Sequence, residues 1–364
     1  MRRSRVRGCL LGGAIGDALG NPVEFLSLDA IRRTHGEYGI AGMVPETDGV
    51  IGRVTDDTQM TLFTAEGLIR ARARSVSEDD GAETACVQRA YRRWLDTQNH
   101  PAPPAHGGAD TVRTGWLRTQ PWLYARRAPG NACLTGVAAG HVPPRYGQIG
   151  TGPVNPQSKG CGTVMRSAPF GLIGESADRA FELAALCAQI THGHPTAALA
   201  SGAFAAIVAY LLEGESAEGA VLRSMDLLRR RPGHEETTAA LRAAIDLAGA
   251  GRPRPERVES LGAGWVAEEA LAIAVYCVLV RTHSVAQALL LSVNHSGDSD
   301  STGAICGNLL GALHGDAQLP LEWLMVTEGR AVITELADDL SLQVEHRALR
   351  PGVPVHSVDR YPAC

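Results

Sequence analysis

The chain has 364 residues, of which 45% are hydrophobic and 20% are charged, and these ordinary globular values exclude extensive disorder. Its formal net charge of −5 gives no bulk positive charge with which to bind nucleic acid. Aromatic residues make up only 5%, whereas 41 residues are glycine, which favours closely packed helices over a β-sandwich. The length fits one large domain or two small ones.

The N-terminal segment repeats glycine at every fourth position. On a helix these residues form one ridge without side chains, which a second helix can approach closely. Glycine costs up to about 1 kcal/mol at each helical position, so the repeat needs a packing or functional reason. Its spacing matches neither G-x-G-x-x-G nor G-x-x-x-x-G-K-[ST]. The repeat consists of Gly8, Gly12, Gly16 and Gly20. A second series near the other end consists of Gly303, Gly307 and Gly311, and we expect the two helices to pack together in the centre.

The extreme N-terminus resembles a signal peptide, because the basic residues 1–5 precede an apolar stretch. Asp17 interrupts that stretch, and no small-x-small cleavage site precedes it. We therefore expect a cytoplasmic protein. The longest apolar runs, Ala203–Leu212 and Ala270–Val280, are shorter than the roughly 18–20 residues that span a membrane, so we expect no membrane partner.

Helical periodicity continues along the chain, and patterns with the two-residue period of a strand are scarce. The predicted helices are Thr58–Arg74, Ala177–Ile190, Thr196–Leu212, Ala217–Arg230, Glu235–Leu247, Val266–Arg281, Ser284–Val293, Thr302–His314 and Leu319–Asp338. The segment Thr97–Gln157 contains nine of the 20 prolines and is predicted to be irregular, with one short helix near Asp110–Thr119. Because no stretch has the length of a flexible linker, we predict a single all-α domain over residues 1–349. Residues 350–364 are expected to form a C-terminal strap or a loose tail.

The eight cysteines include no C-x-x-C pair, which argues against a zinc ribbon and a thioredoxin-like motif. Three of them, Cys187, Cys277 and Cys306, lie in apolar helical runs. We interpret these three as buried, reduced residues that behave as small hydrophobic side chains.

Two acidic clusters precede predicted helices: Thr-Asp-Asp-Thr at 55–58 and Ser-Gly-Asp-Ser-Asp-Ser-Thr at 296–302. One aspartate is enough to cap a helix, whereas crowded carboxylates repel one another unless a cation neutralises them. Oxygen ligands without Cys or His suit Mg²⁺, Mn²⁺ or Ca²⁺ rather than zinc. The second cluster is not an EF-hand, because Leu309 stands twelfth from Asp298. Helix capping and metal binding both stay open, and two ions require that the clusters converge.

Glu24 is a third acidic position of interest. Pro22 ends or bends the preceding helix, which places Glu24 on a turn. An ordinary surface acid is the alternative interpretation.

Together these segments resemble the ADP-ribosylglycohydrolase family, whose members include dinitrogenase-reductase-activating glycohydrolases. The resemblance rests on GCLLGGAIGDALGNPVEF (8–25), TDDTQMTLFTAEGL (55–68), SKGCGTVMRSAPFGL (158–172), ITHGHPTAALASGAF (190–204), GWVAEEALAIAVYC (264–277) and SGDSDSTGAICGNLLGALHG (296–315). It implies one compact all-α domain with a central cleft that holds two Mg²⁺ ions, or Mn²⁺ in some members, together with ADP-ribose.

The resemblance also implies roles for individual residues. The implied metal ligands are Thr55, Asp56, Asp57, Asp298, Asp300 and Ser301, the last standing where many members have threonine. The implied acid/base residues are Glu24, which is mobile in the family, and Asp57. The implied substrate-binding residues are Ser158, Lys159, Gly160, Cys161 and Gly162, which would meet the diphosphate and distal ribose, and His192 in the cleft.

Other interpretations of the substrate-binding residues stay open. Lys159 could be a surface lysine, Cys161 a small spacer, and His192 a helix cap or a core residue. Arg166, in the same motif, either binds phosphate or holds structure.

The expected function is that of a Mg²⁺-dependent hydrolase that cleaves the C1″ glycosidic bond of ADP-ribose, with ADP-ribosyl-arginine on a protein as the substrate that the resemblance favours. Serine-linked, nucleic-acid-linked and small-molecule conjugates are alternative substrates. A non-catalytic ADP-ribose-binding module is an alternative of another class, which the complete set of metal-ligand positions disfavours. We expect the protein to be a monomer.

Overall fold

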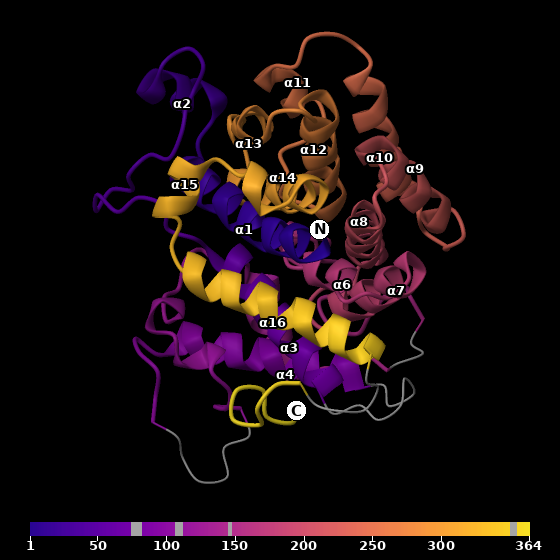
Figure 1. Ribbon diagram of the computed structural model, residues 1–364. Coiled ribbons are helices and arrows are strands. Elements are labelled where there is room, and N and C mark those ends of the chain that lie inside the picture. The colour runs from indigo at the N-terminus through magenta and orange to yellow at the C-terminus, as the bar shows by residue number, and fades with distance from the viewer. Residues whose placement is uncertain (74–81, 106–111, 145–147, 350–354) are drawn as a thin grey trace.

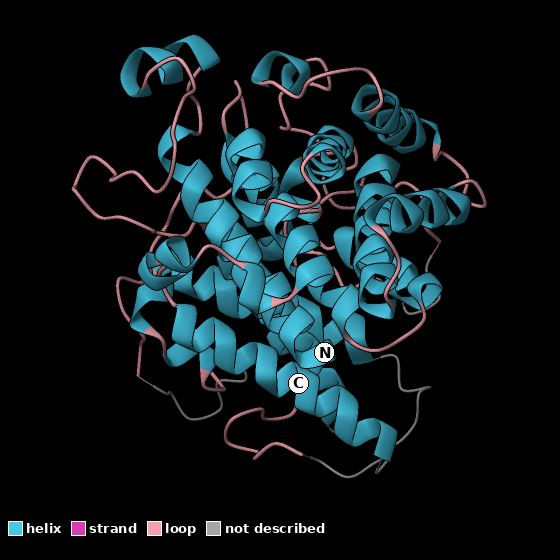
Figure 2. Ribbon diagram, turned by 45° about the horizontal axis from the view of Figure 1, so that its top comes forward, coloured by secondary structure: helices cyan, strands magenta, loops and turns pink. Residues whose placement is uncertain are grey.

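The computed structural model describes residues 1–73, 82–105, 112–144, 148–349 and 355–364. These residues are helical or irregular and contain no β-strand, as Figure 2 shows. A single antiparallel bridge joins Gly160 to Val266. The prediction of an all-α fold is therefore confirmed over the part of the chain that is described.

The α-helices within these residues are numbered in Figure 1. Their bounds are α1 Arg2–Gly20, α2 Leu28–His35, α3 Asp56–Ala73, α4 Ala82–Asn99, α5 Asn131–Ala139, α6 Ala168–Leu172, α7 Ala177–Ala188, α8 Pro195–Glu213, α9 Ala217–Leu228, α10 Glu235–Ala248, α11 Pro255–Glu259, α12 Ala267–Val280, α13 Val285–Val293, α14 Ser299–His314, α15 Leu321–Val326 and α16 Arg330–Leu349. Short 3₁₀ helices are η1 Asn21–Val23, η2 Leu117–Thr119, η3 Pro121–Leu123, η4 Cys161–Thr163 and η5 Asp316–Gln318.

Helices α1 and α14 lie against each other in the middle of the fold (Figure 1). Their glycines are the reason: a Cβ added at any of the four glycines of the α1 repeat would overlap a backbone carbonyl oxygen of α14. The facing positions are Gly8 with Gly311, Gly12 with Gly307, Gly16 with Gly303 and Gly20 with Ser299. The predicted pairing of the two glycine series is confirmed, and it brings the end of α1 beside the start of α14.

The remaining helices surround this pair. In the view of Figure 1, α3, α4 and α16 lie below the pair, α12 and α13 lie above it, and α6 to α9 lie to its right. By length and composition, helix α8 is long and apolar enough to cross a membrane. The apolar run expected from the sequence, Ala203–Leu212, was shorter because the helix begins at Pro195. Within the fold, 89% of its most apolar 18-residue window is buried, as in the core helix of a globular domain.

Three helix predictions need correction. The helix expected over Leu319–Asp338 is two helices, because the chain turns at Gly329, which has a φ of +69°. Helix α4 was not predicted, although its buried Tyr91 and Trp94 lie on one side of a polar sequence. The helix of the irregular segment is α5 rather than one near Asp110–Thr119, where the structure has only η2; residues 106–111 lie outside the described residues.

The last described segment, residues 355–364, is held against the body of the protein. Tyr361 is buried, and its hydroxyl donates a hydrogen bond to Asp339 of α16 at 2.6 Å. The Arg360 guanidinium lies 3.8 Å from the ring centre of Trp116. A disulfide joins Cys364 to Cys86 of α4. By contrast, Cys187, Cys277 and Cys306 are buried and reduced, as predicted.

Candidate functional site

A cavity of about 330 Å³ opens where the ends of several helices converge. Both acidic clusters, Glu24, the loop before η4 and His192 line it. Segments that lie far apart in the sequence therefore meet in one place.

Asp17 of α1 fixes the start of α3. Its buried carboxylate accepts hydrogen bonds from the backbone N–H groups of Thr55 at 3.0 Å and Thr58 at 3.1 Å, and from the Thr58 hydroxyl at 2.5 Å. A helix N-terminus leaves such N–H groups without intrahelical partners, so Asp17 caps α3 from another helix. Asp56 and Asp57 are thereby left to face the cavity.

The second cluster lies at the start of α14, directly beside the first. The backbone of Gly20 packs against the first turn of α14, which brings the two helix ends together. Asp56 and Asp57 of the first cluster line the same cavity as Asp298, Asp300 and Ser301 of the second. The two clusters that the sequence separates thus form one group.

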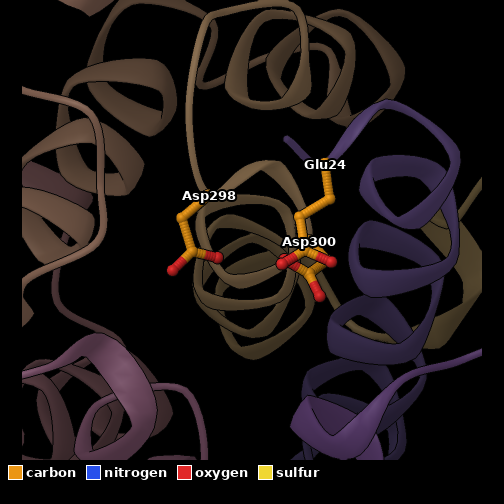
Figure 3. A group of neighbouring side chains, drawn as sticks. All are labelled: Glu24, Asp298 and Asp300. Atoms are coloured by element: carbon orange, nitrogen blue, oxygen red, sulfur yellow. The ribbon is translucent and has the colours of Figure 1, made fainter. Parts of the chain in front are cut away.

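Three carboxylates from two segments approach one another most closely. Glu24, which follows η1, reaches toward Asp298 and Asp300 at the start of α14 (Figure 3). One oxygen of each lies within 4.8 Å of the others, a spacing that one cation could bridge. Burial, and then the Asp300 and Asp298 charges, raise the pKa of Glu24 to about 10.

The aspartates of the first cluster are also buried among like charges. Burial, and then the charge of Asp300, raise the pKa of Asp56 and of Asp57 well above the usual range. Asp57 Oδ2 is buried and has no hydrogen-bond partner among the described residues. An unpartnered buried carboxylate oxygen within a group of acids fits a bound cation, which would supply the missing partner. The donor set is made of carboxylates and hydroxyls and therefore suits a hard cation.

The loop before η4 forms another wall of the cavity. Its lining residues are Ser158, Gly160, Cys161 and Gly162. Lys159 does not line the cavity, because its ammonium pairs with Glu236 at 2.9 Å and with Glu268. The structure therefore does not bring Lys159 to the cavity, and its proposed contact with the substrate stays a prediction, beside the alternative interpretation as a surface residue.

Cys161 does more than provide space in this loop. Its thiol donates a hydrogen bond to Asp298 Oδ2 at 2.7 Å. Burial, and then the Asp298 charge, raise the pKa of the Cys161 thiol well above the usual range. A protonated thiol therefore lies beside one of the carboxylates of the group.

His192 lies next to the loop before η4 and is held by a chain of hydrogen bonds. Arg166 is buried over the ring of Tyr91 and donates a hydrogen bond to the Thr191 hydroxyl at 2.7 Å. The same hydroxyl lies 2.7 Å from Nδ1 of His192. Burial, and then the Arg166 charge, lower the pKa of His192 to about 3, so the imidazole is neutral. Arg166 thus holds structure and does not line the cavity.

The mouth of the cavity is formed by residues that the sequence interpretation did not select. The rings of Phe25 and Trp265 stack there with centroids 5.3 Å apart, although Phe25 is 66% exposed. Phe25 has a φ of +66°, a strained conformation for a residue other than glycine. The first turn of α5 also lines the cavity, with its N–H groups at one edge. Asp17 was likewise missed as a site residue, although a charged residue within an apolar helix is a signal in itself.

Comparison with known proteins gives a consistent result. A sequence model of the ADP-ribosylglycohydrolase family matches residues 1–349. The chain is 26% identical to the ADP-ribosyl-[dinitrogen reductase] glycohydrolase of Rhodospirillum rubrum, over 88% of this chain and 89% of the relative. It is 25% identical to the ADP-ribosylarginine hydrolase Tri1 of Pseudomonas putida, over 92% and 77% of the two chains.

Human ADP-ribosylhydrolase ARH3 is 26% identical, over 93% of each chain. Among solved structures, an ADP-ribosylglycohydrolase-related protein complex has the same fold, with a TM-score of 0.60 over 94% of this chain and 99% of the other at 24% identity. The chain therefore belongs to the ADP-ribosylglycohydrolase family, and it is a hydrolase of glycosidic bonds.

Proposed function

We propose that this protein is a Mg²⁺-dependent hydrolase that releases ADP-ribose from ADP-ribosyl-arginine on a protein by cleaving the C1″ glycosidic bond. The observation that carries the proposal is the convergence of Glu24 and the two acidic clusters in one cavity. Two relatives point to the acceptor: one is named for dinitrogen reductase and the other for ADP-ribosylarginine.

The donor set supports two Mg²⁺ ions, with Mn²⁺ as the alternative. The residues that would hold them are Thr55, Asp56, Asp57, Asp298, Asp300 and Ser301. The orphaned Oδ2 of Asp57 fits this assignment. When bound, such ions polarise the ribose hydroxyls and a water molecule next to the anomeric carbon.

The cavity wall next to the acids suits the rest of ADP-ribose. The loop Ser158–Gly162 exposes backbone next to the N-terminal turn of α5, and N–H groups at a helix N-terminus favour phosphate oxygens. The neutral His192 contributes a ring nitrogen beside Gly160 without adding a charge. The diphosphate would therefore lie on this wall, and the sugar would lie over the carboxylates.

Glu24 and Asp57 are the proposed acid/base residues. Cleavage at C1″ develops oxocarbenium character, and carboxylates nearby stabilise that positive charge. Glu24 is half-buried and also borders the open groove outside the cavity, so its carboxyl lies between the sugar and the acceptor. With cations bound among the neighbouring acids, the pKa of Glu24 would fall and its carboxyl would be ionised, so Glu24 would take a proton from the attacking water and return one to the leaving nitrogen. Asp57 would orient that water.

The test is a panel of arginine-, serine-, cysteine- and DNA-linked ADP-ribose substrates, incubated with and without Mg²⁺, with free ADP-ribose as the readout. We expect release from the arginine linkage, its loss in EDTA, and its recovery when Mg²⁺ is restored. Release from only the serine or DNA linkage would contradict the proposed acceptor. Full activity in a metal-free preparation would contradict the proposed role of Mg²⁺.

Two variants assign the roles of the acids. Asp300→Ala should abolish turnover, whereas Asp226→Ala, an exposed aspartate of α9, should retain it. Glu24→Ala should reduce turnover more than it reduces ADP-ribose affinity measured by calorimetry. Loss of ADP-ribose binding in Glu24→Ala would reject the acid/base role.

A further inference from the structure

Outside the cavity, an exposed apolar surface joins two segments that are far apart in the sequence. We call it the rim patch. It consists of Val50, Ile51, Leu321, Met325 and Val326, which are 42%, 43%, 67%, 53% and 43% exposed. Isolated exposed apolar residues are common on proteins, whereas a cluster is characteristic of a binding surface.

The two segments of the rim patch are in direct contact. Gly52 packs against the backbone carbonyl of Val326, and the N–H of Glu328 donates a hydrogen bond to the Gly52 carbonyl at 2.8 Å. The Glu328 carboxylate also pairs with Arg127. These contacts fix the loop that carries Val50 beside α15, so the patch is a defined surface of the fold.

A groove of about 570 Å³ adjoins the cavity, and its lining includes Asp48 and Arg53, which flank the Val50–Ile51 segment of the rim patch in the sequence. Glu24, Phe25 and Ala128 border both the groove and the cavity. At its outer end lies Asp48, whose carboxylate accepts a hydrogen bond from the N–H of Val50 at 3.1 Å. The groove therefore runs from Glu24, on the proposed leaving-group side, to the residues that flank Val50 and Ile51 of the rim patch.

The charges along the groove leave one cation without a counter-charge. Arg53 pairs with Glu46 at 2.8 Å and with Asp48 at 2.7 Å, and the Arg127 guanidinium is also paired. Arg126 is exposed and forms no ion pair with any residue that the structure describes. The groove thus offers one cationic contact beside an apolar surface.

We propose that the rim patch and Arg126 bind the folded protein that carries the ADP-ribose group, through an apolar side chain and an acidic side chain near the modified residue. This inference rests on the proposed function. The patch has five residues, whereas a standard protein interface uses roughly 20–30 residues on each side, so it is too small for a stable dimer of this chain. It is sufficient as a second contact for a partner already held by its ADP-ribose, because the second contact is then intramolecular.

The experiment compares two substrates with the same bond: ADP-ribosyl-arginine on a folded protein and ADP-ribosyl-arginine as a free amino-acid conjugate. In the double variant Leu321→Asp/Met325→Asp, we expect kcat/KM on the protein substrate to fall about tenfold through KM. Turnover of the free conjugate should stay within about twofold, because neither residue borders the cavity. Arg126→Glu should act in the same direction on the protein substrate. Leu222→Asp, at a leucine of α9 that is 39% exposed and lies outside the rim patch, is the control and should change neither rate.

Each alternative outcome has a separate meaning. Equal effects of the double variant on both substrates, or an effect on neither, would overturn the docking role while leaving the proposed function intact. A wild-type enzyme that hydrolyses neither substrate would refute the proposed function, and the docking proposal with it. A concentration-dependent dimer in sedimentation that the double variant abolishes would assign the patch to a second copy of the chain and overturn the proposal.

Discussion

Two regions meet at the catalytic cavity and are built in opposite ways. The helix pair α1–α14 is joined backbone to backbone through glycine, and it positions Asp17, Asp298 and Asp300. The described residues between α4 and η4 are largely loop, and they supply one wall of the cavity, through residues 128–133, and part of the outer groove. This loop-rich cover is held by side-chain contacts and by the C-terminal strap. The difference teaches that the carboxylates are placed by rigid elements, whereas the acceptor side is formed by segments that can vary.

The strongest test of the helix pair is Gly16→Ala. A Cβ at this position would overlap the carbonyl of Gly303, and both atoms belong to fixed helical backbones. We expect a loss of about 4 kcal/mol or more in unfolding free energy, measured in urea, although alanine is the better helix former. Gly150→Ala is the control, because a Cβ there meets nothing within 4 Å. Equal stability of the two variants would show that the helices can separate at little cost.

The loop-rich cover should respond next to loss of the Cys86–Cys364 disulfide. Removing a bond that closes so long a loop should cost about 2–4 kcal/mol. We expect Cys364→Ser to lower the melting temperature and to make it insensitive to reductant, since the other cysteines are already reduced. Turnover of the free conjugate at 25 °C should persist, because the strap does not border the cavity. An unchanged melting temperature would mean that the strap does not constrain the fold.

Asp17→Asn tests whether the α1–α14 pair fixes the start of α3. An amide nitrogen cannot accept the hydrogen bonds of Thr55 and Thr58, so the first acidic cluster should lose its orientation. We expect the Mg²⁺ concentration for half-maximal activity to rise about 10- to 100-fold. Thr58→Ser keeps the hydroxyl and should behave like the wild type. A variant that is less stable but has unchanged Mg²⁺ dependence would limit Asp17 to helix capping.

The smallest effect is expected where the outer face of α1 meets α16. Hydrogen bonds from Arg3 and Arg7 hold the pKa of Asp338 well below its usual range. The folded-state pKa lies below the unfolded value of about 3.9. The stabilisation is therefore present above pH 4 and is lost as the pH falls below it. Because the group is partly exposed, Asp338→Asn should cost less than about 1 kcal/mol at pH 7. Urea unfolding at pH 7, 5 and 3 should show this difference shrinking; a constant difference would contradict the assignment.

Much of the helical framework could be predicted from the sequence, because its signals are local. The four-residue glycine spacing indicated both helices of the central pair. Two helix faces without side chains can pack backbone to backbone, as these two do. The helices α7 to α10 and α12 to α14 followed from apolar periodicity. The acidic clusters stood out because they hold more carboxylates than helix capping needs.

The rest depends on contacts between distant segments. No local pattern shows that Asp17 caps α3, that Lys159 turns to Glu236, or that Cys86 meets Cys364. The break before α16 likewise depends on the contacts of Glu328 with Gly52 and Arg127. Binding of two ions requires the two acidic clusters to converge, and the sequence does not show whether they do. The packing of α1 on α14 brings them together.

The glycine contacts between α1 and α14 also determine when, during synthesis, the central helix pair can form. Roughly 280 residues separate the end of α1 from the start of α14, so at about 5–20 residues per second the first helix waits roughly 15–60 s for its partner during synthesis. Until then its glycine face has no complement and Asp298 and Asp300 do not exist. The acidic group is therefore completed only after residue 300 has been synthesised, and a chain that stalls earlier carries Glu24, Asp56 and Asp57 without Asp298 and Asp300.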